Sequence, residues 1–83
     1  MIKLLSAECM DDGAITLEFS NGSKGVFNLS RYLSEHSGSL LVPLADEVYA
    51  RRCFIDAGAL CWPNGLELSA QRLHELVLLS KAA

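Results

Sequence analysis

The chain has 83 residues, of which 51% are hydrophobic and 20% are charged, and its formal net charge is −3. We expect a single domain over residues 1–83, because a chain of this length does not divide and its apolar content is typical of a globular protein. The acidic balance argues against a nucleic-acid-binding surface, and no apolar run approaches the roughly 20 residues that span a membrane.

The N-terminal segment and the cysteines indicate the compartment. The first nine residues, MIKLLSAEC, contain one lysine and no apolar segment of secretory length, so we expect no signal peptide. The cysteines are odd in number and match no disulfide framework: they are Cys9, Cys53 and Cys61. Free thiols in a reducing cytoplasm are the expectation that follows.

The first half of the chain predicts a β-hairpin. Apolar residues alternate with polar ones at Ile15, Leu17 and Phe19, which is the pattern of a strand with one buried face. An Asn-Gly hairpin signal follows. A two-residue loop would turn Lys24 and Asn28 toward the buried face, whereas a three-residue loop over 20–22 turns Phe27 and Leu29 there. We favour the three-residue loop, because a slip of one residue exchanges the two faces of a strand.

Two short helices are expected in the middle of the chain. Ser30 can cap a helix that runs to about His36. A second helix is expected from about Leu44 to Arg51, with Leu44 and Val48 on its buried edge. Acidic residues near its start and arginines at its end suit the helix dipole.

A second hairpin and a final helix complete the predicted fold. Residues 53–62 read as a hairpin that turns at Ala57-Gly58, and Ser69 can cap a helix over about 70–80. The inner stripe of that helix is formed by Leu73, Leu76 and Val77. The elements predict an α+β fold with a small antiparallel sheet of about five strands in two hairpin units, two short central helices, and the C-terminal helix packed on one face.

The segment CWPNGLEL, residues 61–68, joins the second hairpin to the last helix. Trp62 should end the strand, because Pro63 restricts it to extended backbone and cannot donate a ladder hydrogen bond. The following Asn64-Gly65 pair supplies the turn. We expect Trp62 to pack against the final helix, while an aromatic wall with polar neighbours is also a feature of ligand sites.

Two motifs carry a family resemblance. The first is formed by Leu17, Phe19, Asn21 and Gly22, and the second by Trp62, Pro63, Asn64, Gly65, Leu68 and Ser69. With these motifs the chain resembles family twenty-four forty-two of the bacterial domains of unknown function over nearly its whole length. Asn28 and Glu67 stand where the family often has Asp, and the change at Asn28 weakens the case for an acidic pair with a role here.

The resemblance implies an antiparallel α+β domain without an assigned activity. Some relatives carry a helix-turn-helix DNA-binding domain after this module. Others are freestanding and look like partners of small neighbouring proteins in toxin–antitoxin-like gene pairs. We expect the freestanding form, because the sequence ends at Ala83.

The sequence contains no catalytic or metal-binding signature. His36 and His74 are isolated and no Cys-x-x-Cys pair occurs, so we expect no metal and no cofactor. Cys61 could approach His74, but a buried small side chain is the simpler interpretation of this cysteine. Asp56 and Glu67 border the tryptophan and are the only carboxylate pair to consider as general acid and base. We therefore expect that the protein is not an enzyme.

Two functional hypotheses remain open. The first is a non-enzymatic protein-interaction module, regulatory or antitoxin-like, that forms a homodimer or binds a small protein partner through the apolar excess at Leu78 and Leu79. The second is a small-ligand sensor, or a minor enzyme, in a groove beside Trp62. Polar contacts in that groove would come from Asn64, Glu67 and Asp56. In neither case do we expect a nucleic acid or a membrane as partner.

Overall fold

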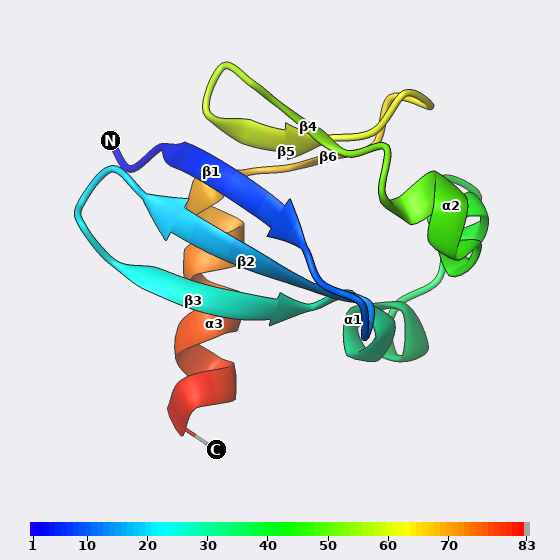
Figure 1. The fold of residues 1–83 in the computed structure, drawn as a ribbon, viewed down its shortest axis with the longest axis horizontal. Helices are drawn as coiled ribbons and strands as arrows, with labels where there is room; N and C mark the ends of the chain where they lie inside the picture. The colour runs from blue at the N-terminus through cyan, green and yellow to red at the C-terminus, as the bar shows by residue number, and fades with distance from the viewer. Residues whose placement is uncertain (83) are drawn as a thin grey trace.

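The structure is a computed structural model that describes the backbone of residues 1–82 and the side chains of residues 1–77. Its elements follow in the order β1 (Leu4–Cys9), β2 (Ala14–Phe19), β3 (Lys24–Asn28), α1 (Leu29–Glu35), the 3-10 helix η1 (Val42–Ala45), α2 (Glu47–Ala50), β4 (Phe54–Asp56), β5 (Ala59–Cys61), β6 (Glu67–Leu68) and α3 (Ala70–Ala82) (Figure 1). Within this described part, no helix is long and apolar enough to cross a membrane.

The strands form two three-stranded antiparallel sheets, in the orders β1-β2-β3 and β4-β5-β6. The α+β class and the antiparallel pairing are confirmed, but the prediction of about five strands in one sheet is wrong. Strands β1 and β4 lie side by side, and a hydrogen bond from the Leu4 N–H to the Gly58 carbonyl (2.9 Å) joins the start of β1 to the β4–β5 turn. The two sheets therefore meet at their edges without sharing a continuous ladder.

The β2–β3 hairpin has the predicted three-residue loop. The Phe19 N–H donates to the Ser23 carbonyl (2.9 Å), which encloses the three residues between them. Gly22 ends the loop with a φ of +87°, in the left-handed region that glycine adopts without steric cost. In this register Phe27 is buried and Lys24 is exposed, as the three-residue loop predicts.

The second hairpin turns at Ala57-Gly58, as predicted, and both residues have positive φ, +51° and +80°. Ile55 pairs with Leu60 across it. All three residues of β5 are buried and all three of β4 are exposed, because β5 is the central strand of its sheet and β4 lies at an edge.

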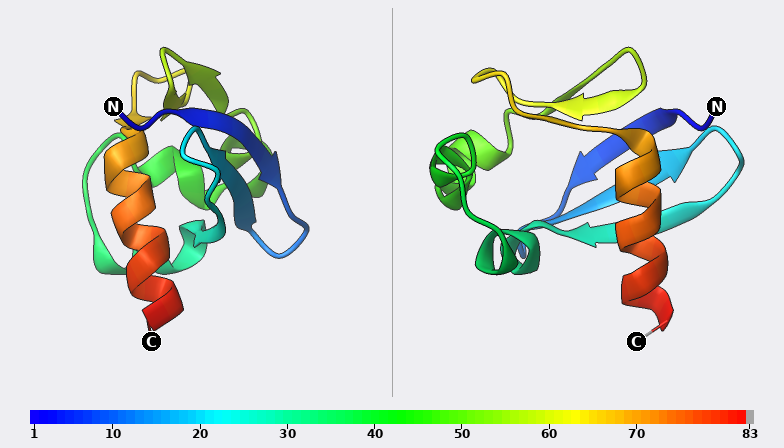
Figure 2. Two further views of the ribbon diagram at one scale, coloured as in Figure 1. Left: turned by 90° about the vertical axis from the view of Figure 1, so that its left-hand side faces the viewer. Right: turned by 180° about the vertical axis from the view of Figure 1, so that it is seen from behind.

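Helix α3 packs on the buried face of the first sheet, which confirms its predicted position. Seen from behind in Figure 2, it lies across the strands, and Val77 is in close contact with Gly25 of β3. The ring of His74 meets the ring of Phe19 edge-on at a centroid distance of 5.1 Å. The Ser69 hydroxyl caps the helix, also as predicted.

One core fills the space between the two sheets and α3. Its largest fully buried side chains are Trp62, Phe19, Ile15, Leu17, Leu60 and Leu73. Because these residues come from both sheets and from the helix, the edge-to-edge sheets share a single apolar interior.

Helix α1 is capped by Asn28, whose side-chain oxygen accepts the Arg31 N–H (3.0 Å). The prediction of Ser30 as the cap is wrong. Leu29, between the two candidates, is already helical and is buried in the core, so the helix starts before Ser30 can serve as its cap. The helix ends at Glu35, and His36 is extended.

We expect Asn28→Ala to lower the free energy of unfolding by about 1 kcal/mol, because the first turn of α1 loses its side-chain acceptor. Asn28→Asp keeps the acceptor, and Ser30→Ala changes an exposed hydroxyl, so each should stay within about 0.5 kcal/mol of the parent. Urea denaturation followed by far-ultraviolet circular dichroism measures all three. Equal losses for Asn28→Ala and Ser30→Ala would contradict the assignment of the cap.

The predicted helix over 44–51 consists of two separate pieces, η1 and α2. Between them Asp46 is extended (ψ 119°), and its carboxylate caps α2 by accepting the Val48 N–H (2.9 Å). The extended residue rotates one piece relative to the other, so Leu44 is 2% exposed whereas Val48 is 74% exposed. The prediction of a buried Leu44–Val48 edge is therefore wrong.

Candidate functional site

The Trp62 corner is a buried joint of the fold. The indole ring is 1% exposed, and its Nε1 donates to the carbonyl of Ala50 (3.0 Å), at the end of α2. The Trp62 N–H donates to the Leu66 carbonyl (3.0 Å), and the Gly65 N–H donates to the Trp62 carbonyl (3.1 Å). The hydrogen bond from the ring thus links the corner to α2, and the sequence does not predict this contact.

The other residues predicted beside Trp62 have local roles. Asn64 uses both ends of its side chain: Nδ2 donates to the Leu40 carbonyl (2.9 Å), and Oδ1 accepts the Leu66 N–H (3.1 Å). Asp56 and Glu67 are exposed on β4 and β6. None of the four predicted ligand contacts lines either of the two cavities described below.

Cys61 lies on β5, the strand between those that carry these two carboxylates. Burial raises the pKa of its thiol, and the charges of Glu67 and Asp56 raise it further. A thiol with a raised pKa carries less of the reactive thiolate at neutral pH. The surroundings of Cys61 therefore oppose nucleophilic activation.

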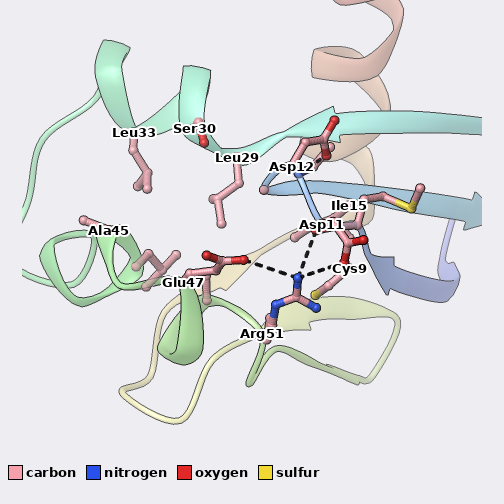
Figure 3. A pocket seen from close by; sticks show the side chains of 15 residues that line it. Cys9, Asp11, Asp12, Ile15, Leu29, Ser30, Leu33, Ala45, Glu47 and Arg51 are labelled. Carbon is pink, nitrogen blue, oxygen red and sulfur yellow. Dashed lines mark hydrogen bonds and ion pairs between the residues drawn. The ribbon is translucent and has the colours of Figure 1, made fainter.

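A larger cavity opens at the far end of the first sheet, and we call it the main cavity. Its volume is about 490 Å³, and it lies between the β1–β2 turn, α1 and the η1–α2 segment (Figure 3). Buried apolar side chains line its interior: Ile15, Leu29 and Leu44. Its volume falls in the range of roughly 300–1,000 Å³ that is usual for binding pockets.

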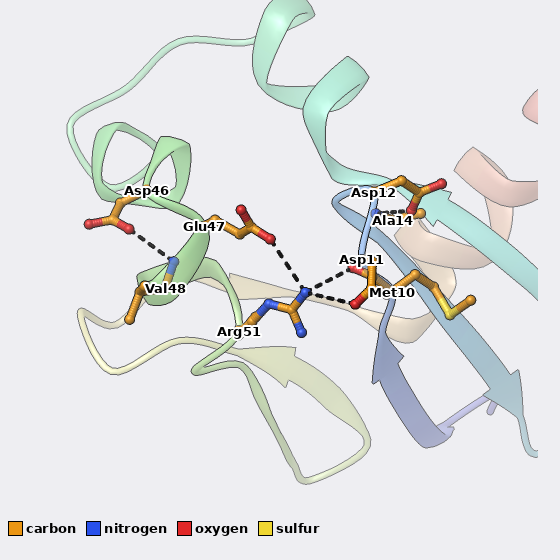
Figure 4. A network of polar contacts seen from close by, with 8 residues as sticks. All are labelled: Met10, Asp11, Asp12, Ala14, Asp46, Glu47, Val48 and Arg51. Carbon is orange, nitrogen blue, oxygen red and sulfur yellow. Dashed lines mark hydrogen bonds and ion pairs between the residues drawn. The ribbon is translucent and has the colours of Figure 1, made fainter.

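Arg51 connects the two sides of the main cavity (Figure 4). One guanidinium nitrogen, Nη2, lies 3.5 Å from Asp11 Oδ1, 3.4 Å from Glu47 Oε1 and 3.4 Å from the carbonyl oxygen of Met10. The β1–β2 turn supplies Met10 and Asp11, and α2 supplies Glu47. Because these groups are largely exposed, the ion pairs contribute at most about 1 kcal/mol each to stability. Their main effect is to position the mouth of the cavity.

The mouth carries more negative than positive charge. Asp12 adds a third carboxylate, which accepts the Ala14 N–H (3.1 Å) and forms no ion pair with Arg51 in the described contacts. The lining residues therefore include three carboxylates and one guanidinium. An occupant with a cationic group and an apolar body would match this combination of mouth and interior.

Comparison with known proteins identifies the family. The family model described as "Protein of unknown function (DUF2442)" matches residues 5–77. The chain belongs to this family. The resemblance inferred from the two motifs is thereby confirmed. No curated protein and no solved structure matches the chain.

In this DUF2442 chain, the sequence motifs do not mark the main cavity. Asp11 and Asp12 lie in the β1–β2 turn, and Arg51 directly follows α2. The sequence does not predict that they meet, because Met10 and Arg51 are 41 positions apart. Only the path of the chain through β2, β3, α1 and η1 brings them together.

A second, smaller cavity of about 150 Å³ lies between β3, α1 and α3. His36 lines it, stacks on the ring of Tyr32 (centroid distance 4.1 Å), and shares a hydrogen bond with the Tyr32 carbonyl through Nδ1 (2.9 Å). The volume is below that of usual ligand pockets. His74 is held elsewhere against Phe19, so the two histidines have separate local roles.

Two predicted interface residues lie outside the described side chains. The backbone of α3 includes Leu78 and Leu79, but the description of side chains ends at Val77. The expected partner contact at these leucines stays a prediction. Within the described residues, no group of three or more potential metal ligands lies together.

Proposed function

We propose that this chain is a non-enzymatic protein-interaction module that binds a basic and apolar segment of a partner protein in the main cavity. The observation that supports the proposal is the position of three carboxylates over an interior lined by buried apolar side chains. An apolar side chain of the partner would enter the cavity, and a neighbouring Lys or Arg would meet the carboxylates. This pairing combines apolar burial with charge complementarity.

Each part of the main cavity has a role in the proposed complex. Leu29 and Leu44 present apolar surface to the entering side chain. Asp12, which is not matched by Arg51, is the strongest candidate to receive the partner's cation. Glu47 and Asp11 keep Arg51 across the mouth, so the cavity is formed before the partner arrives. A preformed site loses less conformational freedom on binding.

Exposed apolar side chains continue outside the cavity on the segments that form it. Val42 is 71% exposed on η1, and Val48 is 74% exposed on α2. A protein segment that covers the mouth could extend over these side chains, whereas a small molecule inside the cavity would leave them in water. This arrangement favours a protein partner over a small ligand.

The proposal extends to the cellular setting. A small neighbouring protein is the partner that the family resemblance suggests, with this chain in a regulatory or antitoxin-like role. The three cysteines are free thiols, which suits a reducing, cytoplasmic compartment. A homodimer formed through α3 is compatible with this role, because none of the described side chains of α3 lines the main cavity.

The second candidate is a small-ligand sensor that uses the same cavity. Its volume of about 490 Å³ is the observation that favours this function. A thermal-shift screen against amphipathic organic amines separates it from the first. Saturable stabilisation by such amines, together with no selection of peptides, would favour the sensor.

Peptide selection tests the proposed function. From a random display library, the immobilised protein is expected to enrich peptides that carry Lys or Arg next to Leu, Ile or Phe. Asp12→Asn keeps the hydrogen bond to Ala14 and removes one negative charge, so it should weaken binding of a selected peptide about two- to fivefold. Fluorescence anisotropy measures the affinity, which should also fall as salt is added.

Glu75→Gln is the matched control, because it removes the same charge from an exposed position of α3 that lines neither cavity. It should leave the affinity unchanged. Selected peptides without basic residues would contradict the proposal. So would equal effects of Asp12→Asn and Glu75→Gln.

A further inference from the structure

Two cysteines that are distant in the sequence lie next to each other in the fold. The Sγ atoms of Cys9 and Cys53 are 3.7 Å apart, although the residues are separated by 44 positions. Cys9 ends β1, and Cys53 directly precedes β4. A disulfide bond is about 2.05 Å long, so the sulfurs would need to approach by less than about 2 Å to form one.

We propose that Cys9 and Cys53 form a redox modification site, which a low-molecular-weight disulfide of the glutathione type converts to an intrachain disulfide. The inference is independent of the proposed partner. It rests on the juxtaposition of two thiols at the place where the edges of the two sheets meet.

The position of the two cysteines would allow a disulfide to link the two sheets. At one end of the neighbouring strands β1 and β4, the Leu4 N–H is bonded to the Gly58 carbonyl. The two thiols lie at the other end of the same strands. A disulfide there would join the sheets at both ends and limit their movement relative to each other.

The surroundings of the two thiols indicate which of them reacts first. Cys9 lines the main cavity, so a small reagent can reach its sulfur from there (Figure 3). Burial raises the pKa of the Cys53 thiol to about 12, and the charge and hydrogen bond of Cys9 contribute to the rise. Cys53 does not line the cavity and holds its proton more firmly, so Cys9 reacts first.

The chemistry is a pair of thiol–disulfide exchanges. The thiolate of Cys9 attacks one sulfur of the reagent and breaks its S–S bond, which leaves a mixed disulfide on Cys9 and releases one thiolate. The Cys53 thiol then gives its proton to that thiolate, and its sulfur attacks the Cys9 sulfur. The mixed disulfide breaks and releases the second reagent molecule as a thiolate, which takes a proton from water. Two protein thiols are oxidised and one reagent disulfide is reduced to two thiols.

The cross-link should stabilise the fold, because it closes a long loop in the unfolded chain. We expect the melting temperature to rise by about 10 °C or more in the oxidised form. The disulfide also changes one wall of the main cavity, since Cys9 lines it.

Mass spectrometry of the folded wild-type protein tests the inference. After incubation with oxidised glutathione, the intact mass should fall by two hydrogens, proteolysis without reductant should yield a Cys9–Cys53 linked peptide, and dithiothreitol should reverse both changes. Cys53→Ser should stop at a glutathione adduct on Cys9 and lose the rise in melting temperature.

Cys61→Ser is the matched control, since the Cys61 thiol is directed to the Ala59 carbonyl within β5. This variant should cross-link like the wild type. A wild-type protein that stops at the glutathione adduct, links Cys61 instead, or reacts only after denaturation would overturn the inference. These outcomes are read from the wild-type protein, so they do not depend on the folding of any variant.

Discussion

Replacing Trp62 by alanine is expected to lower the free energy of unfolding by about 4 kcal/mol. The indole ring belongs to the largest fully buried side chain of the described core, and its N–H is bonded to Ala50 at the end of α2. Truncation would leave a cavity among residues of both sheets and would free α2 from the corner. Because a domain of this size has a total stability of roughly 5–10 kcal/mol, a large part of it would be lost.

Trp62→Phe separates the packing of the ring from its hydrogen bond. It keeps an aromatic ring in the core and loses the N–H that Ala50 accepts, so we expect a loss of about 1–3 kcal/mol. Urea denaturation is followed by circular dichroism, because Trp62 is the only tryptophan of the chain and both variants lose its fluorescence. A loss below about 1 kcal/mol for Trp62→Ala would show that the ring does not hold the two sheets and α2 together.

Gly25→Ala is the second substitution with a large expected effect. A Cβ at this position would overlap Cγ1 of Val77 and lie 3.3 Å from its Cβ. Valine in a helix is restricted to one side-chain rotamer, so Val77 cannot turn away and α3 must move off β3. We expect a loss of about 2 kcal/mol, which outweighs the gain of roughly 0.4–1 kcal/mol that alanine brings by restricting the unfolded chain.

A double-mutant cycle with Val77→Ala measures this contact. The shorter side chain leaves room for the new methyl group, so the cost of Gly25→Ala should fall by at least about 1 kcal/mol in the Val77→Ala background. The same cost in both backgrounds would mean that α3 does not cross the first sheet at Gly25.

The sequence predicts the features that are decided by neighbouring residues. The register of the first hairpin follows from burial, because only one of two loop lengths buries Phe27. The turn at Ala57-Gly58 and the cap at Ser69 depend equally on local chemistry. These features need no knowledge of the rest of the fold.

Other features depend on competition between local signals. Asn28 and Ser30 are both good capping residues, and the burial of Leu29 decides between them. Helical spacing around Asp46 hides the break in the helix, although a capping carboxylate starts a new helix there. Strand β6, Glu67–Leu68, is too short to show a period. No local sequence pattern indicates whether two hairpins share one sheet or form two sheets that meet at their edges.

The candidate site has no local signature in the sequence. A tryptophan beside Pro, Asn and Gly is conspicuous in the sequence, but the fold uses it as a buried joint. The main cavity is built from residues that look ordinary in their own segments, such as Asp12 and Arg51. The juxtaposition of Cys9 and Cys53 is likewise a product of the topology.

We propose that the main cavity, and not the tryptophan corner, is the binding surface of the domain. Nuclear magnetic resonance of the isotopically labelled protein, titrated with the tightest-binding selected peptide, tests this proposal. The largest amide shift changes are expected at Gly13, Ala45 and Arg51. Changes concentrated at Asn64 and Glu67, with the lining of the main cavity unaffected, would contradict it.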